Sequence, residues 1–203
     1  MTLLSTLKPR PIDNWFKSDF QFNQLYPGDI QQLAGKHWTP LHIAQKAIQF
    51  LVTKDGTKVL DIGSGVGKFC LSAAYFKPSA FIHGIEQRGN LVDYAEDAKN
   101  ILGLPNVSFI HRNFTQLDLK QYDHFYLYNP FFENLEGTDK IDSSILYSES
   151  LYDYYNHYLH LQLQELPVGT KVATCCSWDE EILWNYRLVE QISEYYLKFW
   201  IKK

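Results

Sequence analysis

The chain has 203 residues and a mass of 23.8 kDa, with 45% hydrophobic and 21% charged residues. These values indicate one globular domain with a substantial core and exclude extensive disorder. The formal net charge of −4 excludes a strong overall attraction to nucleic acid, although a local basic patch stays open.

The three cysteines, Cys70, Cys175 and Cys176, are too few and too poorly spaced for a disulfide framework or a zinc site. Cys175 and Cys176 are neighbours in an expected strand, so we expect their side chains to point to opposite faces. The N-terminus has no long apolar stretch and no cleavage-site pattern, so we predict neither a signal peptide nor a membrane span. Together these features predict a protein of the reducing cytoplasm that holds no metal.

Residues 1–36 carry little periodic signal, but their aromatic residues are apolar enough to pack. We therefore expect an N-terminal arm (1–36) that packs onto a main domain (37–203). The main domain opens with Thr39, a good N-cap, and Pro40, a good first helical residue. An amphipathic helix is expected over 40–52.

Along the rest of the main domain, apolar periodicity predicts alternating strands and helices. The expected elements are a strand ending at Leu60, a helix from Phe69, and then a strand 80–86, a helix 90–102, strands 107–111 and 124–128, a helix 149–165, a strand 171–175 and a hairpin of 186–192 with 195–201. A polar, acidic loop over 133–148 is long enough to act as a lid.

A glycine-rich turn follows the first buried strand, with glycines at 63, 65 and 67. Such a turn lets a ligand approach the backbone and the next helix N-terminus. The dinucleotide fingerprint would place its third glycine where Lys68 stands, and Asp61 would repel a pyrophosphate. Asp61 suits a cationic amino-acid group instead. Glu86 ends the next strand about twenty residues past the turn, where an acid can bind ribose hydroxyls.

These residues, together with Asn113-Phe114 and Asn129-Pro130-Phe131-Phe132, resemble the motifs of class I S-adenosylmethionine-dependent methyltransferases. The resemblance extends from about residue 38 to the C-terminus. It implies an α/β, single-domain Rossmann-like methyltransferase fold, with a mostly parallel seven-stranded sheet and a C-terminal antiparallel hairpin. It also implies S-adenosylmethionine as the cofactor and S-adenosylhomocysteine as the product.

The resemblance assigns cofactor contacts to Thr39, Asp61, Gly63, Ser64, Gly65, Gly67, Glu86, Gln87, Asn113, Phe114 and Asn129. In the family pattern Asn113 bonds the adenine amine and Phe114 packs near the ring, whereas Thr39 lies near the cofactor carboxylate. Two simpler interpretations stay open. Thr39 can serve only as a helix cap, and Asn113 can cap only the turn that follows it.

Asn129, Pro130, Phe131 and Phe132 are the expected catalytic residues, because they follow a strand where ligands bind in open α/β sheets. The Asn129 side-chain carbonyl and the Pro130 carbonyl can hold the hydrogens of a neutral amine, and either phenylalanine can pack on the substrate. The motif is similar to the Asn-Pro-Pro-aromatic signature of adenine-N6 and glutamine methyltransferases, with Phe131 in place of the second proline. That departure weakens the inference of a planar amine and leaves a lysine side chain equally open. In a simpler alternative, Asn129-Pro130 only turns the chain.

The leading hypothesis is an N-methyltransferase acting on a protein amine of the lysine type, because Tyr128-Asn129-Pro130-Phe131 resembles bacterial proteins related to Dot1-like lysine methyltransferases. Methylation of an RNA or DNA base, methylation of a small molecule, and cofactor binding without catalysis are the alternatives. A nucleotide-dependent oxidoreductase fits worst, because Asp61 and the glycine spacing oppose it. A metal bound by His157 and His160 lacks partner carboxylates. The oligomeric state is left open.

Overall fold

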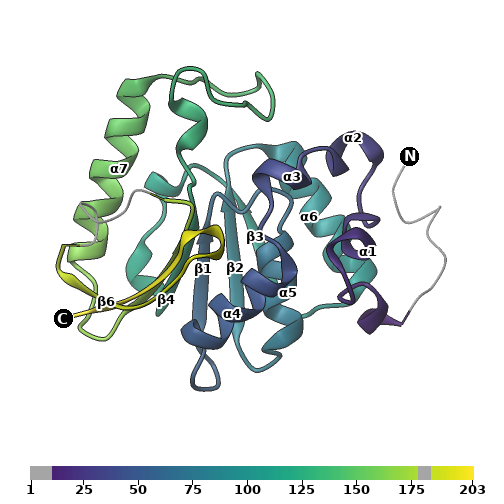
Figure 1. Cartoon of the computed structure of the whole chain (residues 1–203), viewed down its shortest axis with the longest axis horizontal. Coiled ribbons are helices and arrows are strands. Elements are labelled where there is room, and N and C mark those ends of the chain that lie inside the picture. Colours follow the sequence, from purple (N-terminus) through teal and green to yellow (C-terminus); the bar gives the residue numbers. More distant parts are fainter. Residues whose placement is uncertain (1–10, 178–183) are drawn as a thin grey trace.

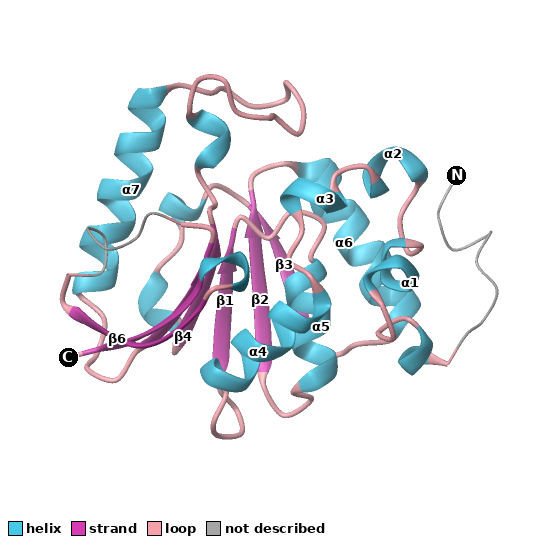
Figure 2. Cartoon of the chain, in the orientation of Figure 1, coloured by secondary structure: helices cyan, strands magenta, loops and turns pink. Residues whose placement is uncertain are grey.

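The computed structural model describes residues 11–177 and 184–203 and is built around a seven-stranded sheet (Figure 2). The strand order is β3-β2-β1-β4-β5-β7-β6. The first five strands are parallel, whereas β7 runs antiparallel to both of its neighbours. The strands are β1 (Lys58–Ile62), β2 (Phe81–Glu86), β3 (Val107–His111), β4 (His124–Tyr128), β5 (Lys171–Cys175), β6 (Tyr186–Ile192) and β7 (Leu197–Lys202). The predicted fold class is confirmed.

Helices cover both faces of the sheet, as parallel strands require. The α-helices are α1 (Asp19–Asn23), α2 (Gly28–Gln31), α3 (Ala34–His37), α4 (Leu41–Leu51), α5 (Lys68–Phe76), α6 (Gly89–Leu102) and α7 (Glu149–Gln164). Alternate strand residues divide the core in two. Val59 packs with α4, α5 and α6, whereas Leu60 and Ile62 pack with α7 (Figure 1).

The arm before α4 packs on the α5 side of the sheet (Figure 1). Phe22, Leu25 and Tyr26 are buried in the same core as α4 and α5. The Tyr26 hydroxyl donates a hydrogen bond to the Val66 carbonyl within the glycine turn, at 2.9 Å. The arm therefore supports the turn directly.

Two local expectations are wrong. Helix α4 begins at Leu41 with Pro40 in the N-cap position, and Leu41 N–H donates to Asp19 Oδ1 of α1 rather than to Thr39. Strand β5 ends at Cys175, and Cys176 has a left-handed φ of 55°. Alternation along a strand therefore does not extend to Cys176, and the sulfurs of both cysteines lie within 3.4 Å of the same carbonyl, that of Tyr195.

Within residues 11–177 and 184–203, no helix is both long enough and apolar enough to cross a lipid bilayer.

Replacing Gly67 by alanine should destabilise the protein more than the same change at Gly103. Both glycines have left-handed φ values, 81° and 65°, which cost an alanine about 1–2 kcal/mol. A Cβ on Gly67 would also lie 2.5 Å from the Phe109 ring, which adds about 1–3 kcal/mol of overpacking, whereas a Cβ on Gly103 meets open space. Urea denaturation of both variants measures the difference, and equal losses would contradict the packing argument.

Candidate cofactor and acceptor site

A cavity of about 390 Å³ opens at the carboxyl ends of β1, β2 and β4. Its walls come from the glycine turn, the residues after β2 and β4, loop 133–148 and Tyr155 of α7. A smaller cavity of about 30 Å³ adjoins it and shares Gly63 and Tyr128 with it. Parallel strands place their ligand sites at this edge of the sheet.

The two cavities gather almost all of the residues expected at the site. The larger one is lined by Gly63, Gly65, Glu86, Gln87, Asn113, Phe114, Asn129, Pro130, Phe131 and Phe132. The smaller one is lined by Thr39, Asp61, Gly63 and Ser64. Gly67 lines neither, since it packs against Phe109 and Ala95. Its role is therefore in the turn and the packing of α5.

The glycine turn touches the Asn129–Phe132 segment directly. Gly63 has a φ of 78°, and a Cβ added there would lie 3.1 Å from Pro130 Cβ. Gly63 and Ser64 N–H groups both donate to the Ile85 carbonyl, which fixes the turn against the end of β2. The backbone of the turn and the predicted catalytic segment therefore share one wall.

Asp61 is a buried carboxylic acid that forms no ion pair with any residue in 11–177 or 184–203. Its exposed fraction is 3%, and its only hydrogen-bond donor among the described residues is the Cys70 thiol, at 3.3 Å. Burial raises the pKa of Asp61 from 3.8 to about 7, partly offset by the Cys70 hydrogen bond, and the charge of Glu86 adds to the rise. A cationic ligand at this place would restore the ionised form.

The smaller cavity has the donor set for a charged amino-acid group. Asp61 can accept from an ammonium, and Lys68 and Ser64 can donate to a carboxylate. Ser64 Oγ is buried and has no hydrogen-bond partner among the described residues. Lys68 is buried too, and its ammonium lies 2.5 Å from Asp19 of the arm. Thr39 hydrogen-bonds the Tyr126 hydroxyl at 2.9 Å.

Glu86 is held by backbone donors at the mouth of the larger cavity. Its Oε1 accepts from the N–H groups of Gln87 (2.9 Å) and Arg88 (3.0 Å), and its Oε2 accepts from Gly65 N–H (3.1 Å). Burial raises the pKa of Glu86, whereas Arg88 and these N–H groups oppose the rise. Because Oε2 has one protein donor, it can accept a further hydrogen bond from a ribose hydroxyl.

Asn113 is engaged within the protein. Its Oδ1 caps the following turn by accepting from Thr115 N–H (3.1 Å), and its Nδ2 donates to the Tyr155 hydroxyl (2.8 Å). Phe114 stacks on Phe131, with centroids 5.0 Å apart. The capping interpretation of Asn113 thus describes its contacts in this structure. Phe114, Phe131 and Tyr155 contact one another and form an aromatic wall.

Asn129 directly follows β4 and has a left-handed φ of 40°. Its N–H donates to Ser177 Oγ at 3.1 Å, and among the described residues its side chain makes no hydrogen bond. Phe131 is buried, whereas Phe132 is 40% exposed at the rim. The conformation leaves an amide oxygen available beside the aromatic wall.

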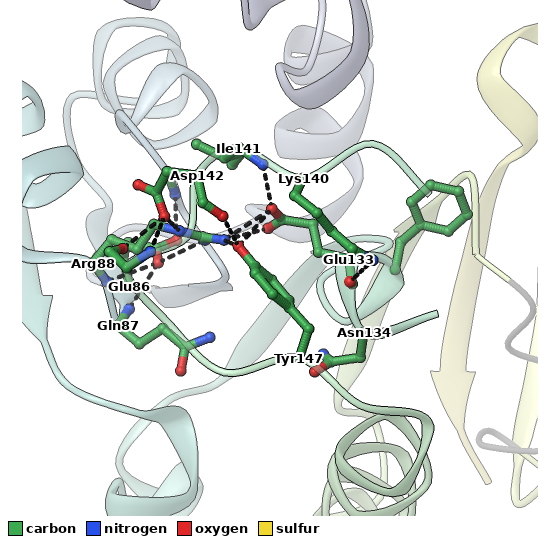
Figure 3. A network of polar contacts seen from close by, with 12 residues as sticks. Glu86, Gln87, Arg88, Glu133, Asn134, Lys140, Ile141, Asp142 and Tyr147 are labelled. Atoms are coloured by element: carbon green, nitrogen blue, oxygen red, sulfur yellow. Dashed lines mark hydrogen bonds and ion pairs between the residues drawn. The ribbon is translucent and has the colours of Figure 1, made fainter. Parts of the chain in front are cut away.

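Arg88 was missed by the sequence analysis, although it lies two residues after Glu86. Its guanidinium is buried and contacts Glu86, Glu133, Asp142 and Tyr147 (Figure 3). No local pattern pairs an arginine after β2 with a loop 45 or more positions later. Among the described residues, no cluster of side chains suits a metal ion.

The chain matches the model of a methyltransferase domain family over residues 53–154, half of its length. The chain belongs to this family. Over 91 residues it is 33% identical to the ribosomal RNA small subunit methyltransferase G of Bacteroides thetaiotaomicron, a match covering 45% of this chain and 43% of that one. Over 106 residues it is 29% identical to the release factor glutamine methyltransferase of Buchnera aphidicola, covering 52% and 38%. The match thus spans less than half the length of each curated relative.

An RNA methyltransferase from Salinibacter ruber, solved in complex with S-adenosyl-L-homocysteine, shares the fold. Its TM-score is 0.54 at 19% sequence identity, and the alignment covers 81% of this chain and 92% of that one. The predicted membership of the class I methyltransferase superfamily is confirmed. S-adenosylmethionine is the cofactor of this superfamily. The hydrogen-bonding groups near Asp61 and Glu86 suit its amino-acid end and its ribose.

Asp61→Asn should stabilise the methyltransferase without cofactor at high pH. Because the folded-state pKa of Asp61 lies above its ordinary value of 3.8, the Asp61 contribution to stability falls as the pH rises from about 4 to about 7. A shift to about 7 corresponds to at most about 4 kcal/mol. Urea denaturation at acidic and alkaline pH measures the difference. A stability gain that does not grow with pH would contradict the buried-acid argument.

Glu86→Ala should weaken S-adenosylhomocysteine binding, because a charged hydrogen-bond acceptor is lost, by about 1.5–3 kcal/mol. Glu190→Ala removes a carboxylate from the exposed face of β6 and is the matched control. Isothermal titration calorimetry measures both. Unchanged affinity in the Glu86 variant would refute its ribose role.

Proposed function

We propose that the protein is an S-adenosylmethionine-dependent N-methyltransferase that acts on a protein amine of the lysine type. The observation that supports this most is the position of Asn129. Asn129 is followed by Pro130, which lies against the glycine turn, and by Phe131 of the aromatic wall, and its side-chain amide makes no hydrogen bond among the described residues. A cytoplasmic location is part of the proposal.

The residues of this chain act mainly by positioning. When bound, the cofactor supplies a methyl group on a sulfonium, ready for in-line displacement. Asp61, with Ser64 and Lys68, would hold its amino-acid end, and Glu86 would hold its ribose. Alignment of the reacting groups can lower such a barrier by roughly 7–11 kcal/mol.

Asn129 would orient the acceptor. Its side-chain oxygen can accept an N–H of a neutral amine and direct the lone pair of the nitrogen toward the methyl group. Ser177 Oγ accepts a hydrogen bond from the Asn129 N–H, which holds the Asn129 backbone in place. The buried aromatic wall lowers the pKa of an entering ammonium, which favours the neutral form without a dedicated base.

The net charge of the chain, −4, favours a cationic segment as the acceptor. Within loop 133–148, Arg88 compensates Glu133 and Asp142, and Lys36 compensates Asp139, so Glu136 is the exposed loop carboxylate without an ion pair among the described residues. A rim of this kind offers a nucleic acid no excess of positive charge. The relative that methylates glutamine in a release factor, by its name, further supports a protein acceptor.

An RNA base is the second candidate acceptor, favoured by the relative named as a ribosomal RNA methyltransferase. In that case Phe131 and the exposed Phe132 would stack on the base. The two candidates differ in the macromolecule that receives the methyl group.

Transfer of label from radioactive S-adenosylmethionine in a methylation-depleted cell extract tests the proposal. The reaction is divided between protease and nuclease treatment. Loss of the label to protease supports a protein acceptor, and loss only to nuclease supports RNA or DNA. Label in a small molecule would redirect the proposal to such acceptors, and no transfer at all would leave a cofactor-binding protein without catalysis.

Asn129→Ala should reduce turnover roughly 100-fold while leaving cofactor affinity nearly unchanged, because misplacement of the acceptor costs about that factor. Asn129→Gly is the matched control for the left-handed backbone, since glycine adopts a φ of 40° without strain. The glycine variant should be equally slow. Turnover that survives in either variant would show that Asn129 does not orient the amine.

A further inference from the structure

Arg88 occupies the N-cap position of α6, two residues after Glu86, the acid expected to bind the ribose. Its side chain is 3% exposed, and its guanidinium contacts both Glu86 and loop 133–148 (Figure 3). Nη1 lies 3.5 Å from Glu86 Oε1, whereas Nη2 donates to both oxygens of Glu133 at 2.8 Å. Nε reaches Asp142 at 3.3 Å, and Nη2 also donates to the Tyr147 hydroxyl at 2.7 Å.

The Glu133 carboxylate that Arg88 contacts also bonds to the backbone of its own loop. Glu133 Oε1 accepts from Ile141 N–H at 2.6 Å, and the Tyr147 hydroxyl donates to the Asp142 carbonyl at 2.8 Å. Lys140 donates to the carbonyl groups of Glu133 and Leu135. Loop 133–148 thus converges on one cation, as the sticks in Figure 3 show.

Arg88 contacts residues on two sides of the larger cavity, the Glu86 side and the loop 133–148 side. On one side, Arg88 compensates the charge of Glu86, whose other oxygen faces Gly65 of the turn. On the other side, it compensates Glu133, while Ile141 and Tyr147 of the same loop line the cavity. Removing a buried cation leaves its carboxylate partners uncompensated, so both sides should respond together.

We propose that Arg88 is a positioning residue that couples the cofactor site to loop 133–148, holding Glu86 for the ribose and fastening the loop as the wall of the acceptor chamber. This inference rests on the proposed function. Because coupling is reciprocal, cofactor bound at Glu86 should strengthen the closed loop, and a closed loop should strengthen cofactor binding.

Several charged groups face the Glu86–Arg88 pair. Asp61 of β1 faces Glu86. Three groups of the loop face Arg88, namely Glu133, Asp142 and Tyr147, and His37 of α3 interacts with Glu133 and Arg88. Arg88 is the cation that opposes the rise in the pKa of Glu86. Without it, ionisation of Glu86 should require a higher pH.

The test compares Arg88→Gln and Glu133→Gln with the control Lys99→Gln. The control also removes a cation from α6, but that cation pairs with Glu96 outside the cavity. Calorimetry with S-adenosylhomocysteine across pH measures the cofactor side. Trypsin cleavage after Lys140, followed by mass spectrometry with and without S-adenosylhomocysteine, measures the loop side.

For Arg88→Gln we expect at least about tenfold weaker binding at neutral pH, with affinity lost on acidification at a higher pH than in the wild type. We also expect faster cleavage after Lys140 that the ligand no longer slows. Glu133→Gln should loosen the loop and weaken binding less than Arg88→Gln does, because Glu86 keeps its cation, and Lys99→Gln should match the wild type.

An unchanged pH profile in Arg88→Gln, or ligand protection of the loop equal to that of the wild type, would overturn the coupling. If Arg88→Gln fails to fold, Glu133→Gln decides, because wild-type cleavage and ligand protection in that variant would also overturn it. Absence of S-adenosylhomocysteine binding by the wild type would instead refute the proposed function.

Discussion

The burial of one carboxylic acid, Asp61, constrains the whole ligand site. It lies one residue before the end of β1, which is flanked by β2 and β4, and no described cation pairs with it. A buried carboxylate is costly to ionise without a partner, and its one hydrogen-bond donor among the described residues is a thiol. The glycine turn beside it provides space instead of side chains, so a partner has to come from a ligand. A cationic amino-acid group satisfies this requirement, whereas a pyrophosphate would be repelled.

The remaining site is arranged around the contact between Gly63 and Pro130. On one side lie the acid and hydroxyl groups suited to a cofactor, and on the other lie the aromatic wall and the Asn129 amide. The contact between Gly63 and Pro130 matters because it brings these two sides together, and methyl transfer depends on alignment more than on acid–base chemistry. Loop 133–148 closes the acceptor side and is fastened through Arg88, so the two sides share a buried charge network rather than a rigid wall alone.

The fold and the grouping of residues around the glycine turn could be predicted from sequence because their signals are local. Buried parallel strands give apolar runs, and a turn with three left-handed glycines can be recognised from spacing. Contacts between distant segments leave no such pattern. The pairing of Arg88 with Glu133 and the bond between Asn113 and Tyr155 each join residues more than 40 positions apart. Cys176 was placed wrongly for a local reason, because its left-handed conformation ends the alternation of β5.

Proton release on cofactor binding tests the central claim about Asp61 most directly. Calorimetric titrations with S-adenosylhomocysteine at about pH 6.5, in buffers of different ionisation enthalpy, measure it; at this pH the α-amino group, with an ordinary pKa of about 7.7–8.0, is already charged. We expect net release of protons, because the bound ammonium ionises an acid whose pKa is about 7, and we expect Asp61→Asn to abolish the release. Binding without proton release, or release that persists in the variant, would show that Asp61 is not the acid that meets the ammonium.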